Sequence, residues 1–156
     1  YSTPNARFEY VFGNMLIDRT HYSKRAFGVE YSGTGTNLWM ASAAVYMALM
    51  GPQGMEDVGT TILYNSQYAA KKISEIPGVS LRFSSPFFQE FVVDFNETNL
   101  TVEDINKALL KEKIFGGLDL SADFKELGQS ALYCVTEVIT KEEIDTLVAK
   151  LTEIVM

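Results

Sequence analysis

An uninterrupted stretch without charge in the first half of the chain is the strongest local pattern. No charged residue occurs between residues 31 and 55, and apolar side chains occupy every face of a helix over 38–50. Thr36 or Asn37 can cap the start of this helix, and Gly51-Pro52 ends it. Because a helix that is apolar on all sides is a buried one, we expect residues 38–50 to lie in a core or at an interface.

The residues that follow predict a second helix and two strands. Pro52 suits the first turn of a helix, and one apolar stripe then repeats at intervals of three, four or seven up to Pro77-Gly78. The stripe consists of Met55, Val58, Ile62, Ala69, Ile73 and Ile76. Two alternating runs beyond this point are typical of half-buried strands. Their apolar faces are Val79, Leu81 and Phe83 in the first, and Phe91, Val93 and Phe95 in the second.

The last third of the chain predicts two helices and one strand. Thr101, with Asp104 three residues on, is a weak capping box for a helix with the stripe Ile105, Ala108 and Leu109. Residues 115–130 are expected to form a loop, and residues 132–135 a buried strand. Thr140 and Glu143 make a stronger capping box for the final helix, whose apolar face is Ile144, Leu147, Val148, Leu151 and Val155.

Residues 1–33 differ from the rest because they are rich in aromatic residues and show no helical period. A strand over 8–12 is predicted there, closed by Gly13-Asn14 and continued as a hairpin by 15–17. The whole order, two helices, then β-β-α-loop-β-α, predicts an α/β fold of the α+β two-layer kind. Its helices would pack on a small, mostly antiparallel sheet.

Composition narrows the range of functions. The chain has 156 residues, a net charge of −7, one Cys and one His. These counts exclude an internal disulfide and a zinc site of three or four nitrogen or sulfur ligands. An acidic chain with a pI near 4.7 also argues against nucleic-acid binding. We find no signal-peptide pattern, and the run over 38–50 is too short to span a membrane, so we expect a cytoplasmic protein with no membrane contact.

The segment Ser32-Gly33-Thr34-Gly35-Thr36-Asn37 is the best local candidate for a binding site. Glycines let backbone N–H groups approach an anion, the Thr hydroxyls add donors, and the following helix start carries partial positive charge. The segment is therefore a candidate phosphate site, with Gly33, Thr34, Gly35 and Thr36 as its contacts. A Gly-rich turn that only caps the helix is the alternative.

Other candidates are weaker. Gly116-Gly117 indicates a close backbone approach or a simple helix end. Glu137 could orient a substrate or a loop, although an exposed strand end is the simpler interpretation. His21 with its basic neighbours could face a phosphate or a carboxylate, and a surface cluster is the simpler interpretation. Cys134 lies in an apolar run and is expected in the core. No Ser/His/Asp set, metal cluster or carboxylate pair suited to catalysis is present, so we assign no catalytic residue.

Four stretches together resemble a known family. They are Ala44 to Gly51, Phe87 to Val93 (Phe-Phe-Gln-Glu-Phe-Val-Val), Ile114 to Leu120 (Ile-Phe-Gly-Gly-Leu-Asp-Leu), and Cys134 to Asp145. Their order and spacing are similar to the C-terminal part of the family of glycine dehydrogenase (decarboxylating) subunit 1, the P-protein of the glycine cleavage system. The resemblance covers roughly residues 34–155, and none of its motifs is a catalytic signature.

This resemblance implies the small C-terminal domain of a fold type I enzyme dependent on pyridoxal 5′-phosphate (PLP). Residues 1–33 would then be the end of the large domain, and 34–156 the small domain. By the family pattern the Schiff-base Lys belongs to subunit 2, so no Lys of this chain is assigned that role. The missing Met at position 1 agrees with a piece of a longer protein, which we expect to be inactive alone.

The resemblance also implies partners. These are the missing large domain of the same subunit, subunit 2 of the P-protein, the lipoyl H-protein that accepts the aminomethyl group, and glycine as substrate. The complete enzyme would be an oxidoreductase and a hetero-oligomer. A lone fragment would expose the face that these partners cover, which favours a homo-oligomer of the fragment.

Two alternatives stay open at this stage. Residues 30–37 depart from the P-protein pattern and are closer to the Glu-x-Gly-Thr-x-Asn segment of class V aminotransferases and cysteine desulfurases, in which a Thr reaches the PLP phosphate of the neighbouring subunit. A free-standing α/β binding module is the other alternative. The apolar helix over 38–50 counts against that module, because a self-sufficient domain would give this helix a polar face.

Overall fold

Gly51 divides the long helix of this chain into two parts. In the computed structural model, which describes residues 2–4, 10–12 and 37–156, helix α1 spans Asn37–Ser74. Its only non-helical backbone is at Gly51, with φ 63° and ψ −178°. Gly tolerates this positive φ, and Pro52 then opens the next helical segment. The predicted pair of helices, with a break at Gly51-Pro52, is therefore confirmed.

The same position separates two compact units, residues 1–51 and 52–156. In the first unit, β1 (Ser2–Pro4) pairs antiparallel with β2 (Tyr10–Phe12). Residues 10–12 of the strand predicted over 8–12 thus form a strand whose partner is β1, while residues 8–9 lie outside the described residues. The expected continuation over 15–17 and the expected domain boundary at 33/34 both lie outside the described residues.

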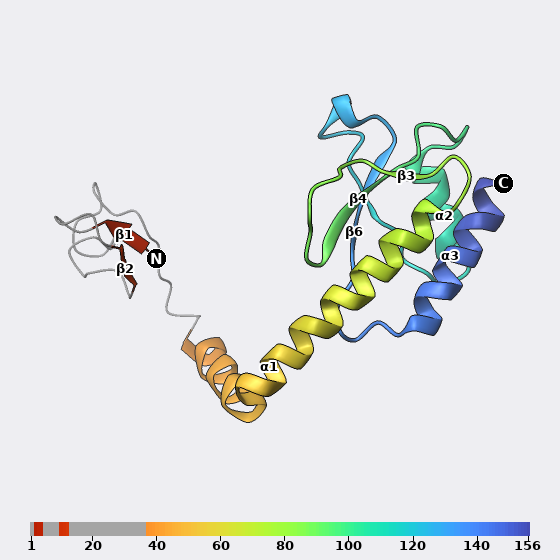
Figure 1. The fold of residues 1–156 in the computed structure, drawn as a ribbon. Coiled ribbons are helices and arrows are strands. Elements are labelled where there is room, and N and C mark those ends of the chain that lie inside the picture. Colours follow the sequence, from red (N-terminus) through yellow and green to blue (C-terminus); the bar gives the residue numbers. More distant parts are fainter. Residues whose placement is uncertain (1, 5–9, 13–36) are drawn as a thin grey trace. The chain divides into compact units, whose positions relative to one another are not determined.

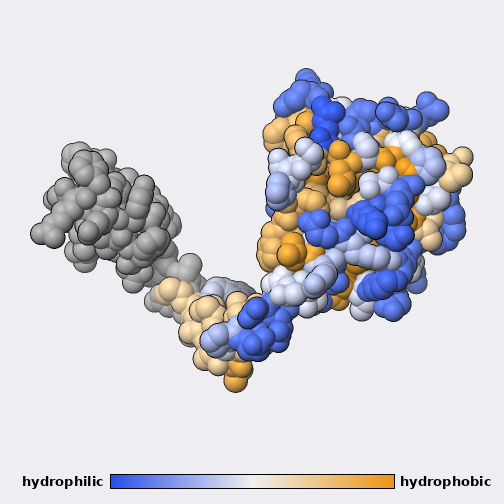
Figure 2. Space-filling model, viewed as in Figure 1, coloured by the Kyte–Doolittle hydropathy of each residue, from blue (hydrophilic) through white to orange (hydrophobic). Residues whose placement is uncertain are grey.

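The N-terminal half of α1 exposes its apolar side chains, as the hydrophobic colouring of this stretch shows (Figure 2). Residues 39–49 are all exposed, with Trp39 at 76% and Leu49 at 81%. Within the ranges that the structure describes, nothing buries these side chains, so the expected core position of this helix is not found there. The interface alternative stays a prediction.

The second unit is a four-stranded antiparallel sheet with helices packed against it (Figure 1). The strands lie in the order β3-β4-β6-β5, and their bounds are β3 Ser80–Leu81, β4 Glu90–Asp94, β5 Leu118–Asp119 and β6 Ser130–Cys134. Helix α2 spans Val102–Lys111 and α3 spans Lys141–Val155. A short 3-10 helix, η3, covers Lys125–Leu127. The predicted fold class is confirmed, and so is the element order apart from β5 and η3, which lie in the segment expected to be a loop.

Alternation along the strands places the core on one face of the sheet. Phe91, Val93 and Phe95 are buried, whereas Val92 and Asp94 between them are only half-buried. Side chains of α1, α2 and α3 complete this core. Its helical members include Ala69, Ile73, Val102, Ile105, Leu109, Ile144 and Leu151. The predicted stripes thus point inward, except that Met55 and Phe83 are exposed at 41% and 55%.

Both predicted caps start helices, and the one at Thr140 is a complete capping box. The Thr101 hydroxyl accepts the Asp104 N–H at 3.1 Å. At α3, Thr140 Oγ1 accepts the Glu143 N–H at 3.2 Å, while the Glu143 carboxylate accepts the Thr140 N–H at 2.8 Å. These bonds satisfy N–H groups that a helix start otherwise leaves unpaired.

Two expectations for the sheet need correction. Residues 115–130 are not all loop, because β5 and η3 lie within them and β6 begins at Ser130. A two-residue strand is too short to show a period of two. Cys134 is exposed, since it pairs with Glu90 on the side of the sheet opposite the buried Tyr133 and Val135. No helix of the described residues is long and apolar enough to span a bilayer.

Candidate functional site

Two of the sequence motifs meet at one end of the sheet. The β3–β4 loop (residues 82–89) leads into β4, and the β6–α3 loop (residues 135–140) leaves β6 beside it. Glu90 of β4 pairs with Cys134 of β6, and the Val135 N–H donates to the Gln89 carbonyl oxygen at 3.0 Å. Two motifs far apart in sequence therefore lie together at one end of the sheet.

Helix α1 holds the β3–β4 loop through side chains. Ser66, which is fully buried, donates its hydroxyl to the Phe88 carbonyl at 2.5 Å and lies 3.0 Å from the Leu63 carbonyl of its own helix. The Gln67 amide donates to the Phe87 carbonyl at 3.3 Å. A buried hydroxyl needs such a partner, so the loop backbone and the helix satisfy each other here.

The neighbouring side chain of α1 holds the β6–α3 loop. Asn65 Nδ2 donates to the Ile139 carbonyl oxygen at 2.8 Å and lies 3.4 Å from that of Thr136. Three consecutive residues, Asn65, Ser66 and Gln67, thus bond carbonyl groups of both loops. We call these three residues the α1 clamp.

A surface cluster fixes α3 against α1 next to this clamp. The Tyr68 hydroxyl donates to Asp145 at 2.6 Å, Lys141 Nζ lies 2.7 Å from the other Asp145 oxygen, and the same Nζ lies 5.0 Å from the centre of the Tyr68 ring. The hydrogen bond from Lys141, followed by that from Tyr68, holds the pKa of Asp145 below its ordinary value.

The Gly116-Gly117 motif is explained by close packing. A Cβ atom at Gly117 would lie 2.5 Å from Tyr133 Cε2, and one at Gly116 would lie 1.9 Å from Asn106 Oδ1. The Asn106 amide also donates to the Gly117 carbonyl oxygen at 2.8 Å. The motif is therefore a close backbone approach, as one of the two sequence interpretations expected.

Tyr133 is buried beneath this motif and its hydroxyl has no hydrogen-bond partner among the described residues. Burial raises the pKa of Tyr133 to about 12, with the Gly117 backbone offsetting part of the rise. A groove of about 650 Å³ opens beside it, lined mainly by apolar residues of the 113–116 turn, β6 and α3. Phe115 stands at its rim with 87% of its surface exposed.

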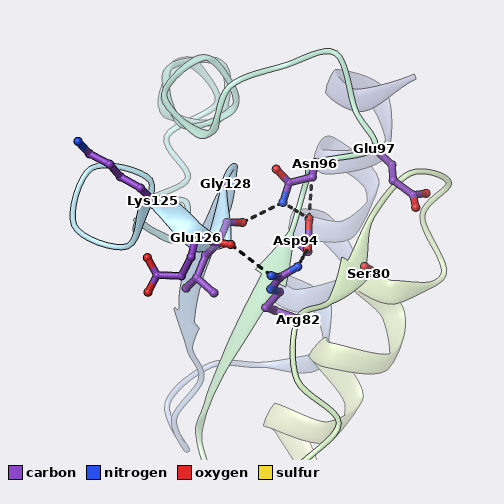
Figure 3. Close-up of a pocket in the computed structure, with 9 residues that line it drawn as sticks. Ser80, Arg82, Asp94, Asn96, Glu97, Lys125, Glu126 and Gly128 are labelled. Atoms are coloured by element: carbon purple, nitrogen blue, oxygen red, sulfur yellow. Dashed lines mark hydrogen bonds and ion pairs between the residues drawn. The ribbon is translucent and has the colours of Figure 1, made fainter.

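A polar hollow of about 440 Å³ lies at the opposite end of the sheet (Figure 3). Arg82 bonds Asp94 at 3.1 Å, and Asp94 in turn accepts both the backbone N–H and the side-chain amide of Asn96 at 2.8 and 2.7 Å. Figure 3 shows these three side chains pointing toward one another, while Lys125 points away. Because Arg82 is already paired with a carboxylate, this hollow is poorly suited to bind an anion.

The predicted phosphate contacts, Gly33, Thr34, Gly35 and Thr36, lie outside the described residues, as does His21. Glu137 is exposed on the β6–α3 loop. The described residues include no group of three potential metal ligands. Lys107 and Lys141 point to solvent, with 64% and 63% of their side-chain surface exposed. A lysine lines each of the two cavities described above, but the groove beside Lys113 is mainly apolar and Lys125 points away from the polar hollow (Figure 3), so neither is suited to the phosphate of PLP.

The α1 clamp was missed by sequence reasoning. Its members bond groups that are 20 to 74 residues away, and such contacts leave no local pattern. The only available signal was a run of three polar residues between the apolar positions Ile62 and Ala69.

Comparison with known proteins gives consistent matches. The chain is 44% identical over 110 residues to "Probable glycine dehydrogenase (decarboxylating) subunit 1" of Desulfitobacterium hafniense, covering 70% of this chain and 24% of that protein. It is 36% identical over 144 residues to the protein of the same name from Staphylothermus marinus, covering 92% and 31%. The chain therefore spans less than a third of the length of these relatives. No protein-family model matches it.

Solved structures agree with the sequence matches. A crystal structure of glycine decarboxylase (P-protein) of the glycine cleavage system, in inhibitor-bound form, matches with a TM-score of 0.73 and 25% identity. The match covers 99% of this chain and 34% of that one. A C-DES mutant with glycine covalently linked to its PLP cofactor matches with a TM-score of 0.60 and 18% identity over 97% and 35%, which supports the fold alone. The resemblance seen in the sequence, and the fold type I PLP-enzyme architecture it implied, are confirmed.

Proposed function

Because this chain is a relative of glycine dehydrogenase (decarboxylating) subunit 1, we propose that it forms the C-terminal part of such a subunit and contributes to the decarboxylation of glycine. The observation that carries the proposal is the agreement of sequence and fold over nearly the same length. A relative matches 92% of the chain, and the P-protein structure matches 99%. The sheet and its covering helices would be the small domain of the complete enzyme.

PLP, when bound to the complete enzyme, supplies an electron sink for cleavage of the carboxyl bond of glycine. The residues of this chain that would contact it are Thr34 or Thr36, with Gly33 and Gly35, through its phosphate. The covalent lysine would come from subunit 2. The described residues would provide position and support, since none of them forms a catalytic set.

The remaining assignments belong to the same proposal. The partners are the large domain of this subunit, subunit 2, and the lipoyl H-protein that takes the aminomethyl group. Relatives more than three times as long as the matched region support a missing large domain. We propose that the chain alone is inactive and that the enzyme works in the cytoplasm.

The phosphate contact can be tested by weakening it. In the full-length subunit paired with subunit 2, Thr34→Val or Thr36→Val removes one hydroxyl donor, while Thr61→Val changes a hydroxyl that bonds only its own helix at Asp57. Replacing the Thr that contacts the phosphate should weaken PLP affinity about tenfold, since a hydrogen bond to a charged group is worth about 1.5–3 kcal/mol. Unchanged PLP affinity in both Thr34 and Thr36 variants would remove this segment from the site.

The substrate can be tested against the PLP-enzyme alternative. Residues 30–37 resemble a segment of class V aminotransferases and cysteine desulfurases. The full-length subunit paired with subunit 2 should therefore be given glycine and cysteine in parallel. We expect glycine to change the PLP absorbance and release CO2, with no sulfur released from cysteine. Sulfur release from cysteine without any response to glycine would replace the glycine proposal. A well-behaved monomer of the chain, with no affinity for the other subunit, would support the free-standing binding module.

A further inference from the structure

The α1 clamp ties two loops together that have no helix or strand of their own. Ser66 has one hydroxyl proton, and its shorter contact is to Phe88 of the β3–β4 loop rather than to its own helix. Asn65 reaches the β6–α3 loop at Ile139. Since fixing each loop residue costs conformational entropy, these bonds and the Val135 to Gln89 bond help to hold the two loops in one arrangement, together with Phe87 and Ile139, which pack against the core.

Both loops expose apolar side chains to solvent, which a domain that works alone has no need to do. Phe88 on one loop and Val138 on the other are 50% and 71% exposed, and Glu90 and Glu137 are exposed beside them. The clamp therefore bonds the backbone of two loops whose apolar and acidic side chains are exposed.

We propose that Asn65 and Ser66 are positioning residues, which hold the β3–β4 and β6–α3 loops as a single surface against which the remainder of the enzyme packs. This inference rests on the proposed function. The occupant is the large domain of the same subunit, because the relatives extend over more than twice as much additional chain as the matched region. The clamp keeps the two loops in register for that contact, and neither residue touches the reacting atoms.

The first test measures amide hydrogen exchange in the chain itself. Asn65→Asp keeps the shape of the side chain but replaces the donor with an anion facing two carbonyl groups. Ser66→Ala removes the hydroxyl, and Thr61→Ala is the matched control, because its hydroxyl bonds only Asp57 of the same helix. We expect exchange to quicken roughly fivefold to tenfold in both loops for either clamp variant, in line with the net worth of one hydrogen bond.

The coupling of the two loops is the decisive part of this result. Asn65→Asp touches only the β6–α3 loop directly, so faster exchange in the β3–β4 loop shows that the loops act as one unit. Exchange that quickens in one loop alone, or equally throughout residues 52–156, overturns the inference. The control should leave both loops unchanged.

The second test uses the full-length subunit with subunit 2 and PLP. We expect Asn65→Asp to lower kcat for CO2 release from glycine by about tenfold, with a smaller change in KM, because a small displacement of a docked domain costs catalysis more than binding. If Asn65→Asp speeds amide exchange in the loops but leaves kcat at the wild-type value, the positioning role is overturned. Failure of the wild-type enzyme to act on glycine would instead refute the proposed function and leave the exchange result intact.

Discussion

The Tyr68 hydroxyl of α1 donates a 2.6 Å hydrogen bond to the Asp145 carboxylate of α3. Lys141 bonds the other oxygen of the same carboxylate at 2.7 Å. These three side chains fasten the last helix to the helix that also carries the clamp. All of them are at least partly exposed, so the cluster defines how the helices pack more than it adds to stability.

Asp145→Asn should lower the midpoint of thermal unfolding slightly, and only above acidic pH. The folded-state pKa of Asp145 lies below its ordinary value of 3.8. Its contribution is therefore present above the unfolded pKa and is lost as pH falls through the folded pKa. Thermal unfolding of both proteins between pH 3 and pH 7 tests this. The difference between them should begin to shrink as pH falls below about 3.8 and should be lost only below the folded-state pKa of Asp145. Asp123→Asn, at an exposed aspartate, is the control.

Gly117→Ala should destabilise the second unit by about 1–3 kcal/mol, which is the usual cost of overpacking. The added methyl group would meet the Tyr133 ring at 2.5 Å and Ala131 Cβ at 2.9 Å. Urea unfolding measures the change. Gly59→Ala is the matched control, since nothing lies within 4 Å of a Cβ there. Because Gly59 lies within helix α1, Gly59→Ala should instead stabilise the chain by about 0.5–1 kcal/mol. Equal effects at both positions would contradict the close approach at Gly117.

Tyr133→Phe should leave stability unchanged or raise it slightly at neutral pH. The buried hydroxyl has no hydrogen-bond partner of good geometry within the described ranges, so its removal relieves a desolvation cost and gives up at most a weak interaction with the Gly117 backbone. Because burial raises the pKa of Tyr133 to about 12, wild-type stability should fall as pH rises from 10 toward 12. That fall should be smaller in the variant. A loss above about 1 kcal/mol at pH 7 would show that the hydroxyl is bonded after all.

Lys113→Gly should stabilise the chain by up to about 1 kcal/mol. Lys113 has φ 63° and follows the end of α2, where its N–H bonds the Leu110 carbonyl at 3.0 Å. A left-handed residue just after a helix favours Gly, because Gly has no Cβ to clash. Lys111→Gly, which changes the last residue of α2, should instead destabilise the chain by about 1 kcal/mol. Urea midpoints that move in the same direction for both variants would contradict this explanation.

Local rules account for much of the fold. The breaks at Gly51 and Pro77, the caps at Thr101 and Thr140 and the buried faces of β4 and α3 are all set by neighbouring residues, and each could be predicted. The exposure of Trp39 and of Cys134 could not. Helix 38–50 is apolar whether or not this chain covers it, and the side of the sheet on which Cys134 lies depends on its register with Glu90.

The candidate site was less predictable than the fold. The Gly116-Gly117 motif was visible, but its partners Asn106 and Tyr133 are set by how α2 and β6 pack. The clamp residues bond backbone carbonyl groups far along the chain, so only the packed structure brings them together. The phosphate segment over 33–36 stays a prediction from sequence.

The release of labelled CO2 from carboxyl-labelled glycine tests the central claim most directly. It should be measured with the full-length subunit, its partner subunit, PLP and the lipoyl protein, and in parallel with this chain alone. We predict label release by the complete assembly and none by the chain. No release by the complete assembly, or turnover of glycine by the chain alone, would contradict the claim that this chain is the supporting small domain of a glycine-decarboxylating enzyme.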